Sequence, residues 1–254
     1  MSTESTKSVA VFIPVDDANW RQLAVNIADI KRQRNASVHV VVLDRTTSGI
    51  GRVGDATVVS LGRDCSLGEA YRTGLKHTNA GLIALAMPGV RMLPNRISRQ
   101  RTAMAIKPDA DLITCNMVLV DDHGRLTAEA DPDKADEAPT PLWQAGAMIR
   151  RNALGRIGQS DDLPVELFLY MKLRSQGRTS HLAEALTVAD AEWFFGLIED
   201  SLKDALAIRK ISPPIAPARD RFAEASRTFD HHVTGTGSVT DALDRMIREG
   251  TFDR

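Results

Sequence analysis

From Asn79 to Ile97 the chain reads Asn-Ala-Gly-Leu-Ile-Ala-Leu-Ala-Met-Pro-Gly-Val-Arg-Met-Leu-Pro-Asn-Arg-Ile. Its first part, Gly81 to Met87, is apolar and uncharged, which predicts a strand buried on both faces of a sheet. The Met87–Val90 stretch contains Pro-Gly and predicts a turn. A new helix then opens at Asn95. A buried strand that passes through a turn into a helix is the repeating unit of an α/β fold.

Three earlier runs of the chain share the character of that strand. They are rich in β-branched residues, and the strands they predict are Ser8–Val15, Ser37–Asp44 and Ala56–Leu61. Between the first two runs, apolar residues recur at the spacing of a helix. Between the last two of the four strands, Ser66 and Glu69 form a capping box at the head of another helix. Strands alternating with helices predict βαβ units and a mostly parallel sheet flanked by helices.

The carboxyl ends of these strands are where ligands bind in open α/β sheets. Asp44 closes the second strand, and the Met87–Val90 turn closes the fourth. Because parallel strands end at the same edge of the sheet, we expect Asp44 and this turn to lie on one side of the molecule. We therefore place the candidate site there.

The second half of the chain has a different pattern. A long apolar run up to Val120, followed by Asp-Asp-His-Gly, predicts a hairpin. Glu129–Thr140 is acidic and lacks apolar periodicity, which predicts a loop. A strand is expected at Ala145–Ile149 and a helix from Pro164 to about Gln176, with Gly177 as its stop. We predict one domain over residues 1–189 and a C-terminal helical extension over residues 190–254, a plausible element for a homodimer.

The composition excludes several classes of protein. Lys plus Arg total 32 against 33 Asp plus Glu, so the charge balance gives no reason to expect nucleic acid as a partner. The two cysteines favour a reducing compartment over a disulfide framework. No apolar run is long enough to span a membrane, and the first residues lack the apolar core of a signal peptide. We expect a cytoplasmic protein, and a peripheral association with the membrane stays open.

Several segments resemble, in order, those of the inverting family-two glycosyltransferases, which have a GT-A fold. Val42–Gly49 resembles the family's loop Val-Asp-Asp-Gly-Ser-Thr-Asp-Gly, with Asp44 as its one remaining acid. Ser66–Leu75 resembles the segment ending Ala-Arg-Asn-x-Gly, and Gln144–Gly158 resembles the stretch containing Ile-Arg-Arg. The resemblance covers about three quarters of the chain. It fails at the Met87–Val90 turn, where the family carries an Asp-x-Asp motif and this chain has no carboxylate.

The resemblance implies a role for each candidate residue. Asp44 would accept the N–H of the nucleotide base of a sugar-nucleotide donor. Glu166, on the acceptor-side helix, would be the catalytic base, with Asp161 and Asp162 as alternatives. The family holds a divalent metal at its Asp-x-Asp motif, but hard cations demand oxygen ligands and this turn offers only main-chain carbonyls, so we expect no divalent metal there. A guanidinium can then neutralise the leaving diphosphate, and the candidates are Arg91, Arg72 and Arg45.

Ordinary structural roles compete with each of these assignments. Asp44 also fits a turn-capping residue, and Glu166 also fits an exposed position on its helix. The run of arginines that follows the turn is typical of a solvated helix face; it comprises Arg91, Arg96, Arg99 and Arg101.

Two functions from different classes follow. The first is transfer of a sugar from a nucleotide-sugar donor, without metal, to a saccharide, lipid-linked or protein acceptor. The alternative is a catalytically inactive GT-A module that acts as a binding or scaffold protein. A module that has lost catalysis would also have lost both acids of the motif, as this chain has. A nucleotidyltransferase is a weaker third hypothesis, since Val15–Trp20 is not a glycine-rich phosphate loop.

Overall fold

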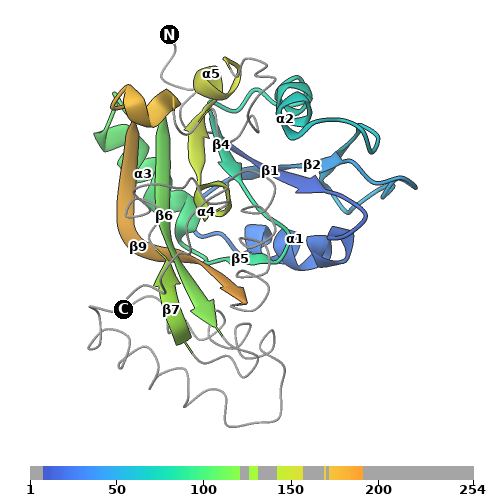
Figure 1. Ribbon diagram of the computed structural model, residues 1–254, viewed down its shortest axis with the longest axis horizontal. Helices are drawn as coiled ribbons and strands as arrows, with labels where there is room; N and C mark the ends of the chain where they lie inside the picture. The colour runs from blue at the N-terminus through green and yellow to red at the C-terminus, as the bar shows by residue number, and fades with distance from the viewer. Residues whose placement is uncertain (1–7, 121–125, 131–141, 157–168, 170–171, 191–254) are drawn as a thin grey trace, which may run out of the picture.

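A computed structural model of the chain describes residues 8–120, 126–130, 142–156, 169 and 172–190 (Figure 1). The strands are β1 (Val9–Val15), β2 (Val38–Asp44), β3 (Thr57–Ser60), β4 (Leu82–Leu85), β5 (Val90–Met92), β6 (Leu112–Val120), β7 (Leu126–Ala130), β8 (Met148–Arg150) and β9 (Thr179–Asp190). The helices are the 3₁₀ turn η1 (Trp20–Gln22), α1 (Leu23–Lys31), α2 (Leu67–Leu75), α3 (Arg96–Ile106), α4 (Leu142–Ala145) and α5 (Arg151–Leu154). Residues 172–175 are also helical. The strands form one sheet, in the order β3-β2-β1-β4-β8-β6-β9-β5, with β7 paired to β6.

The first four of these strands form the parallel half of the sheet, as the sequence predicts. β1 pairs in parallel with both β2 and β4, and β2 pairs in parallel with β3. The connections cross through η1–α1 and through α2. Val15 and Asp44 are register partners, so β1 and β2 end at the same level of the sheet. This common edge is the one that carries the candidate site.

Helices cover both faces of this half of the sheet, which explains why its strands are continuous apolar runs. On β1, Phe12 faces a core shared with α2 and α5, whereas Ile13 faces a core shared with α1 and α3. Figure 1 places α2 and α5 on the upper side of β1 and β2 and α1 on the lower side. Since both faces are buried, β1 and β4 show no alternation of polar and apolar residues and carry no charged or polar side chain.

The other half of the sheet is mixed and contains two strands that the sequence pattern did not predict. β8 is antiparallel to both β4 and β6, whereas β9 is parallel to β6 and antiparallel to β5. β5 is only three residues long, which is too short to give a periodic signal. β9 has alanines and polar residues between its apolar positions, and its register with β6 shifts near Asn116. Tertiary pairing, rather than local pattern, creates both strands.

Most of the other predicted elements are confirmed. Ser66 is the N-cap of α2, and its Oγ accepts a hydrogen bond from the Glu69 N–H at 3.3 Å. The hairpin forms as β6 and β7. The predicted loop Glu129–Thr140 is wrong at its start, because β7 continues to Ala130. Residues 131–140 and the helical extension 190–254 lie outside the described residues, apart from Asp190, which ends β9.

The contact between α2 and the sheet gives the first testable prediction. A Cβ at Gly74 would lie 2.8 Å from Cδ2 of Leu43 and 3.0 Å from Cε2 of Phe12, both fully buried. Gly→Ala inside a helix normally stabilises by up to about 1 kcal/mol. We expect Gly74→Ala instead to lower the free energy of unfolding by about 1–3 kcal/mol, since the core must be displaced.

Urea denaturation measures this difference, with Gly155→Ala as the matched control. Gly155 has φ −68, and the nearest atom to a Cβ there is the Arg151 carbonyl oxygen at 3.4 Å. The control is expected to be neutral or slightly stabilising. A Gly74→Ala variant as stable as this control would show that α2 does not pack as closely as described.

Candidate functional site

The loops at the carboxyl ends of β1 and β2 are tied directly to one another. The Asp17 carboxylate accepts hydrogen bonds from the Thr47 backbone N–H at 3.0 Å and from its hydroxyl at 2.6 Å. These two bonds hold the pKa of Asp17 below its ordinary value. The Arg45 N–H also donates to the Val15 carbonyl at 2.9 Å. The two loops therefore form one connected rim at the carboxyl edge of the parallel strands.

Asp44 lies at this edge, where the sequence places it, but its carboxylate is turned into its own loop. Oδ1 accepts bonds from the N–H and hydroxyl of Thr46 at 3.0 and 2.7 Å, and Oδ2 accepts the Ile50 N–H at 2.8 Å. The residue is only 1% exposed. This geometry matches the capping alternative and counts against direct contact with a nucleotide base. Asp44 fixes the shape of the 45–50 loop instead.

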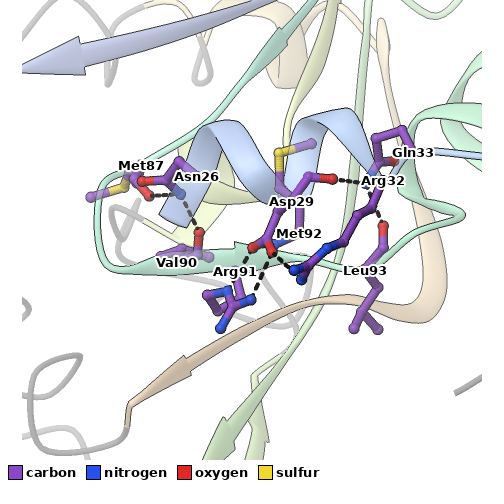
Figure 2. Close-up of polar contacts among 9 residues, drawn as sticks. All are labelled: Asn26, Asp29, Arg32, Gln33, Met87, Val90, Arg91, Met92 and Leu93. Carbon is purple, nitrogen blue, oxygen red and sulfur yellow. Dashed lines mark hydrogen bonds and ion pairs between the residues drawn. The ribbon is translucent and has the colours of Figure 1, made fainter. Parts of the chain in front are cut away.

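The Met87–Val90 turn carries no carboxylate, and helix α1 holds it from the inner side (Figure 2). The Val90 N–H donates to the Met87 carbonyl at 3.0 Å, and Gly89 takes the left-handed conformation with φ 89. The Asn26 amide donates to the Met87 carbonyl at 3.3 Å and to the Val90 carbonyl at 2.8 Å. Two of the carbonyls that a cation could use at this turn thus point inward. Within the described residues, no group of three His, Cys, Asp or Glu side chains is arranged to hold a metal ion.

Arg91, the residue that the sequence analysis placed first for diphosphate binding, forms a buried ion pair. Its Nε and Nη2 bind the two oxygens of Asp29 at 2.6 and 2.7 Å, and the Met92 N–H adds a third bond to Asp29 (Figure 2). The side chains of Arg91 and Asp29 are 9% and 0% exposed. A bidentate pair of this kind neutralises the guanidinium. The position therefore counts against a diphosphate-binding role and shows a structural one.

Two other predicted arginines, Arg45 at the carboxyl rim and Arg72 on α2, both lie near Cys65. Arg45 follows β2 and donates from Nε to the Cys65 carbonyl at 2.7 Å, just before α2. Arg72 lies on α2, and both guanidinium groups act electrostatically on the Cys65 thiol. Burial nevertheless raises the pKa of this thiol. Both arginines are half-buried, so they combine a fixed position with partial access to solvent. Of the predicted basic residues, these two fit an anion site best.

The arginines of α3 are not a uniform solvated face, which corrects that interpretation. Arg99 is exposed and binds Glu184, and Arg101 donates to the Asn35 carbonyl at 2.9 Å. Arg96, in contrast, is completely buried. A helix that packs one face on a sheet turns every third or fourth residue inward, and Arg96 falls on the inner stripe with Ile97 and Gln100.

The predicted base, Glu166, lies outside the described residues, as do Asp161 and Asp162. Sequence reasoning also missed the polar residues of α1 that organise the turn. Asn26 and Asp29 fall on the same helical face as Leu23 and Ile27, and all four are buried. A polar residue within an apolar helical stripe is a readable signal, because burial demands a hydrogen-bonding partner.

Comparison with solved structures finds the same architecture in TarS of S. aureus. The chain matches TarS with a TM-score of 0.56 and 14% identity, over 80% of this chain and 40% of that one. It matches the 1–349 fragment with UDP at a TM-score of 0.55 and 14% identity, covering 80% of this chain and 67% of the fragment. The fragment with UDP-GlcNAc matches at a TM-score of 0.51 and 11% identity, covering 92% of this chain and 69% of the fragment. The chain has a GT-A-like glycosyltransferase fold.

The likeness is one of fold alone, since the identities are low. No protein-family model and no curated protein sequence matches the chain. The chain corresponds to 40% of the full TarS chain, so most of that protein has no counterpart here. Within the described residues, no helix is both long and apolar enough to cross a membrane.

The Asp29–Arg91 pair generates a prediction about stability. Asp29→Asn leaves a buried guanidinium without its counter-ion, and we expect it to destabilise the protein by about 3–5 kcal/mol. The double variant Asp29→Leu with Arg91→Met should recover most of that loss, because it removes both charges and refills the space. Chemical denaturation of the variants measures the differences.

Arg99→Gln provides the matched control for this pair. It breaks the exposed ion pair with Glu184, which is worth less than about 1 kcal/mol. If Asp29→Asn were no more destabilising than Arg99→Gln, the pair would not be the buried anchor described here.

Proposed function

We propose that the chain transfers a sugar from a nucleotide-activated donor to an acceptor, with inversion and in a single displacement. The observation that carries the proposal is the GT-A-like fold, shared with a protein whose structures contain UDP and UDP-GlcNAc. The connected rim at the carboxyl ends of β1, β2 and β4 is the edge at which such sheets bind ligands. The donor would lie across this edge.

The side chains at this edge support a specific division of roles. Arg45 and Arg72 would contact the diphosphate, because Arg45 is fixed at the rim, Arg72 lies on the neighbouring helix α2, and both keep partial access to solvent. The base would rest against the 45–50 loop, whose shape Asp44 sets from within. Glu166 would accept the proton of the acceptor hydroxyl as that oxygen attacks the anomeric carbon.

Metal-independent chemistry is part of the proposal. The Met87–Val90 turn supplies no carboxylate, and Asn26 occupies the carbonyls of Met87 and Val90. Charge on the leaving diphosphate would therefore be stabilised by guanidinium groups, as other enzymes do when they bind developing negative charge.

A second candidate function is a GT-A module that binds a saccharide or a protein and catalyses nothing. The turn without carboxylates favours it, and so do the structural contacts of Asp44 and Arg91. The two functions differ in whether donor binding is followed by loss of the sugar.

Donor binding is tested by thermal shift with UDP, GDP, ADP and TDP sugars, each with and without Mn²⁺. A donor at a hundredfold excess over its Kd stabilises by about 2.7 kcal/mol, which raises the Tm of a domain of this size by about 5–10 °C. We expect one nucleotide class to do so without Mn²⁺. Arg45→Gln and Arg72→Gln should each reduce the shift, whereas Arg101→Gln, whose guanidinium binds Asn35 elsewhere, should not. A shift that appears only with Mn²⁺ would contradict the metal-independent site.

Glu166→Gln separates the enzyme from the inactive module. If Glu166 is the base, the variant should lose transfer by at least about a hundredfold and bind the donor as tightly as before. Release of free nucleoside diphosphate from the donor, with and without a panel of saccharide acceptors, is the measurement. A wild-type chain that binds a donor and never turns it over would favour the binding module.

A further inference from the structure

The guanidinium of Arg96 is the most unusual charged group in the described part of the chain. Its Nη2 donates to the carbonyls of Leu85 and Ala147 at 2.8 and 3.1 Å, and its Nε donates to the Gln100 side-chain oxygen at 3.2 Å. Its Nη1 is buried and has no hydrogen-bond partner among the residues that the structure describes. No carboxylate of the described residues forms an ion pair with it. Burial lowers the pKa of Arg96 from its ordinary value, and an arginine nevertheless stays protonated in proteins.

An unpaired buried charge of this kind lowers the stability of the folded state. An unpaired charge in a protein interior loses its hydration, and neutral carbonyls replace only part of it. A methionine or leucine would fill a buried position on α3 without that penalty. The positive charge itself therefore calls for an explanation, beyond the packing of the side chain.

The position of Arg96 next to the turn supplies an explanation for its charge. Leu85 is the last residue of β4, two residues before the Met87–Val90 turn, and Arg96 donates a hydrogen bond to its carbonyl. The neighbouring cation Arg91 is neutralised by Asp29. Among the described residues next to this turn, Arg96 thus contributes a positive charge that no carboxylate offsets. Coulomb interactions through the protein interior are screened less than those through water.

We propose that Arg96 stabilises the diphosphate of the donor by its electric field, from the protein interior next to the turn and without touching the ligand. It supplies part of the positive charge that a divalent cation held by acidic residues would otherwise bring to this place. The assignment rests on the proposed function, since it requires a nucleoside diphosphate at the turn. A purely structural Arg96 would only tie the end of β4, at Leu85, to Ala147, the residue before β8.

Affinities for a charged and an uncharged ligand distinguish these two roles. UDP and uridine share the base and sugar, but only UDP carries the diphosphate. If the thermal-shift experiment selects another nucleotide, the corresponding nucleoside diphosphate and nucleoside replace UDP and uridine. We expect Arg96→Met to weaken UDP binding about tenfold or more while uridine binding changes less than about twofold. Calorimetry measures the Kd of UDP, NMR titration measures the Kd of uridine, and the Tm of each variant confirms that it is folded.

Two further variants complete the test. Arg96→Lys keeps the charge and shortens the reach, so it should lower Tm yet preserve the ratio of UDP to uridine affinity. Arg99→Gln, on the outer face of the same helix, should change neither affinity. If Arg96→Met fails to fold, Arg96→Gln, which also removes the charge, takes its place, and an unchanged ratio of UDP to uridine affinity in it overturns the proposal. Equal losses for UDP and uridine, or no loss of either, also overturn it. A wild-type chain that binds no nucleoside diphosphate refutes the proposed function itself.

Discussion

The contact between helix α1 and the segment that follows β4 is the constraint on which the candidate site depends. Asn26 and Asp29 of α1, together with Gln33 just after the helix, bind the main chain and side chains of residues 87–93 (Figure 2). The buried Asp29–Arg91 pair is the centre of this contact. Because a buried ion pair is costly to form and more costly to break, it leaves the turn only one well-defined position. The shape of the sheet edge is thereby fixed by residues that never face a ligand.

The turn that lacks the acids of the family motif is well ordered because α1 holds it. The turn is not a loosened remnant of a metal site, since Asn26 holds its carbonyls and Gly89 takes the conformation that only glycine adopts freely. Its order is instead provided from the inside by amide and carboxylate groups of α1. In the site proposed above, the positive charges near the donor would come from Arg45, Arg72 and Arg96, and none from the turn itself.

The sequence predicted the parallel half of the fold because its signals are local. Apolar runs mark β1, β2 and β4, and the Ser66–Glu69 box marks the start of α2. It could not predict β5, whose partner strand lies about a hundred residues further along the chain. It did not reveal that Arg91 and Arg96 are buried, because the identity of a residue does not show whether its side chain is solvated. The pairing of Arg91 with Asp29 spans 62 residues, and only the fold brings the two together.

The antiparallel pairing of β5 with β9 has a consequence for how the protein assembles during synthesis. Val90 pairs with Ala189, so the strand that leaves the turn is completed by nearly the last described residue. The ribosome releases the chain from its N-terminus, and β1 to β4 can associate early. The edge strand beside the turn, however, must wait until about a hundred more residues have emerged, and pairings of such high sequence separation form slowly. Among the described strands, the one that leaves the turn of the candidate site is therefore the last to find its partner, and a nascent chain would complete this part of the sheet only after residue 189 has emerged.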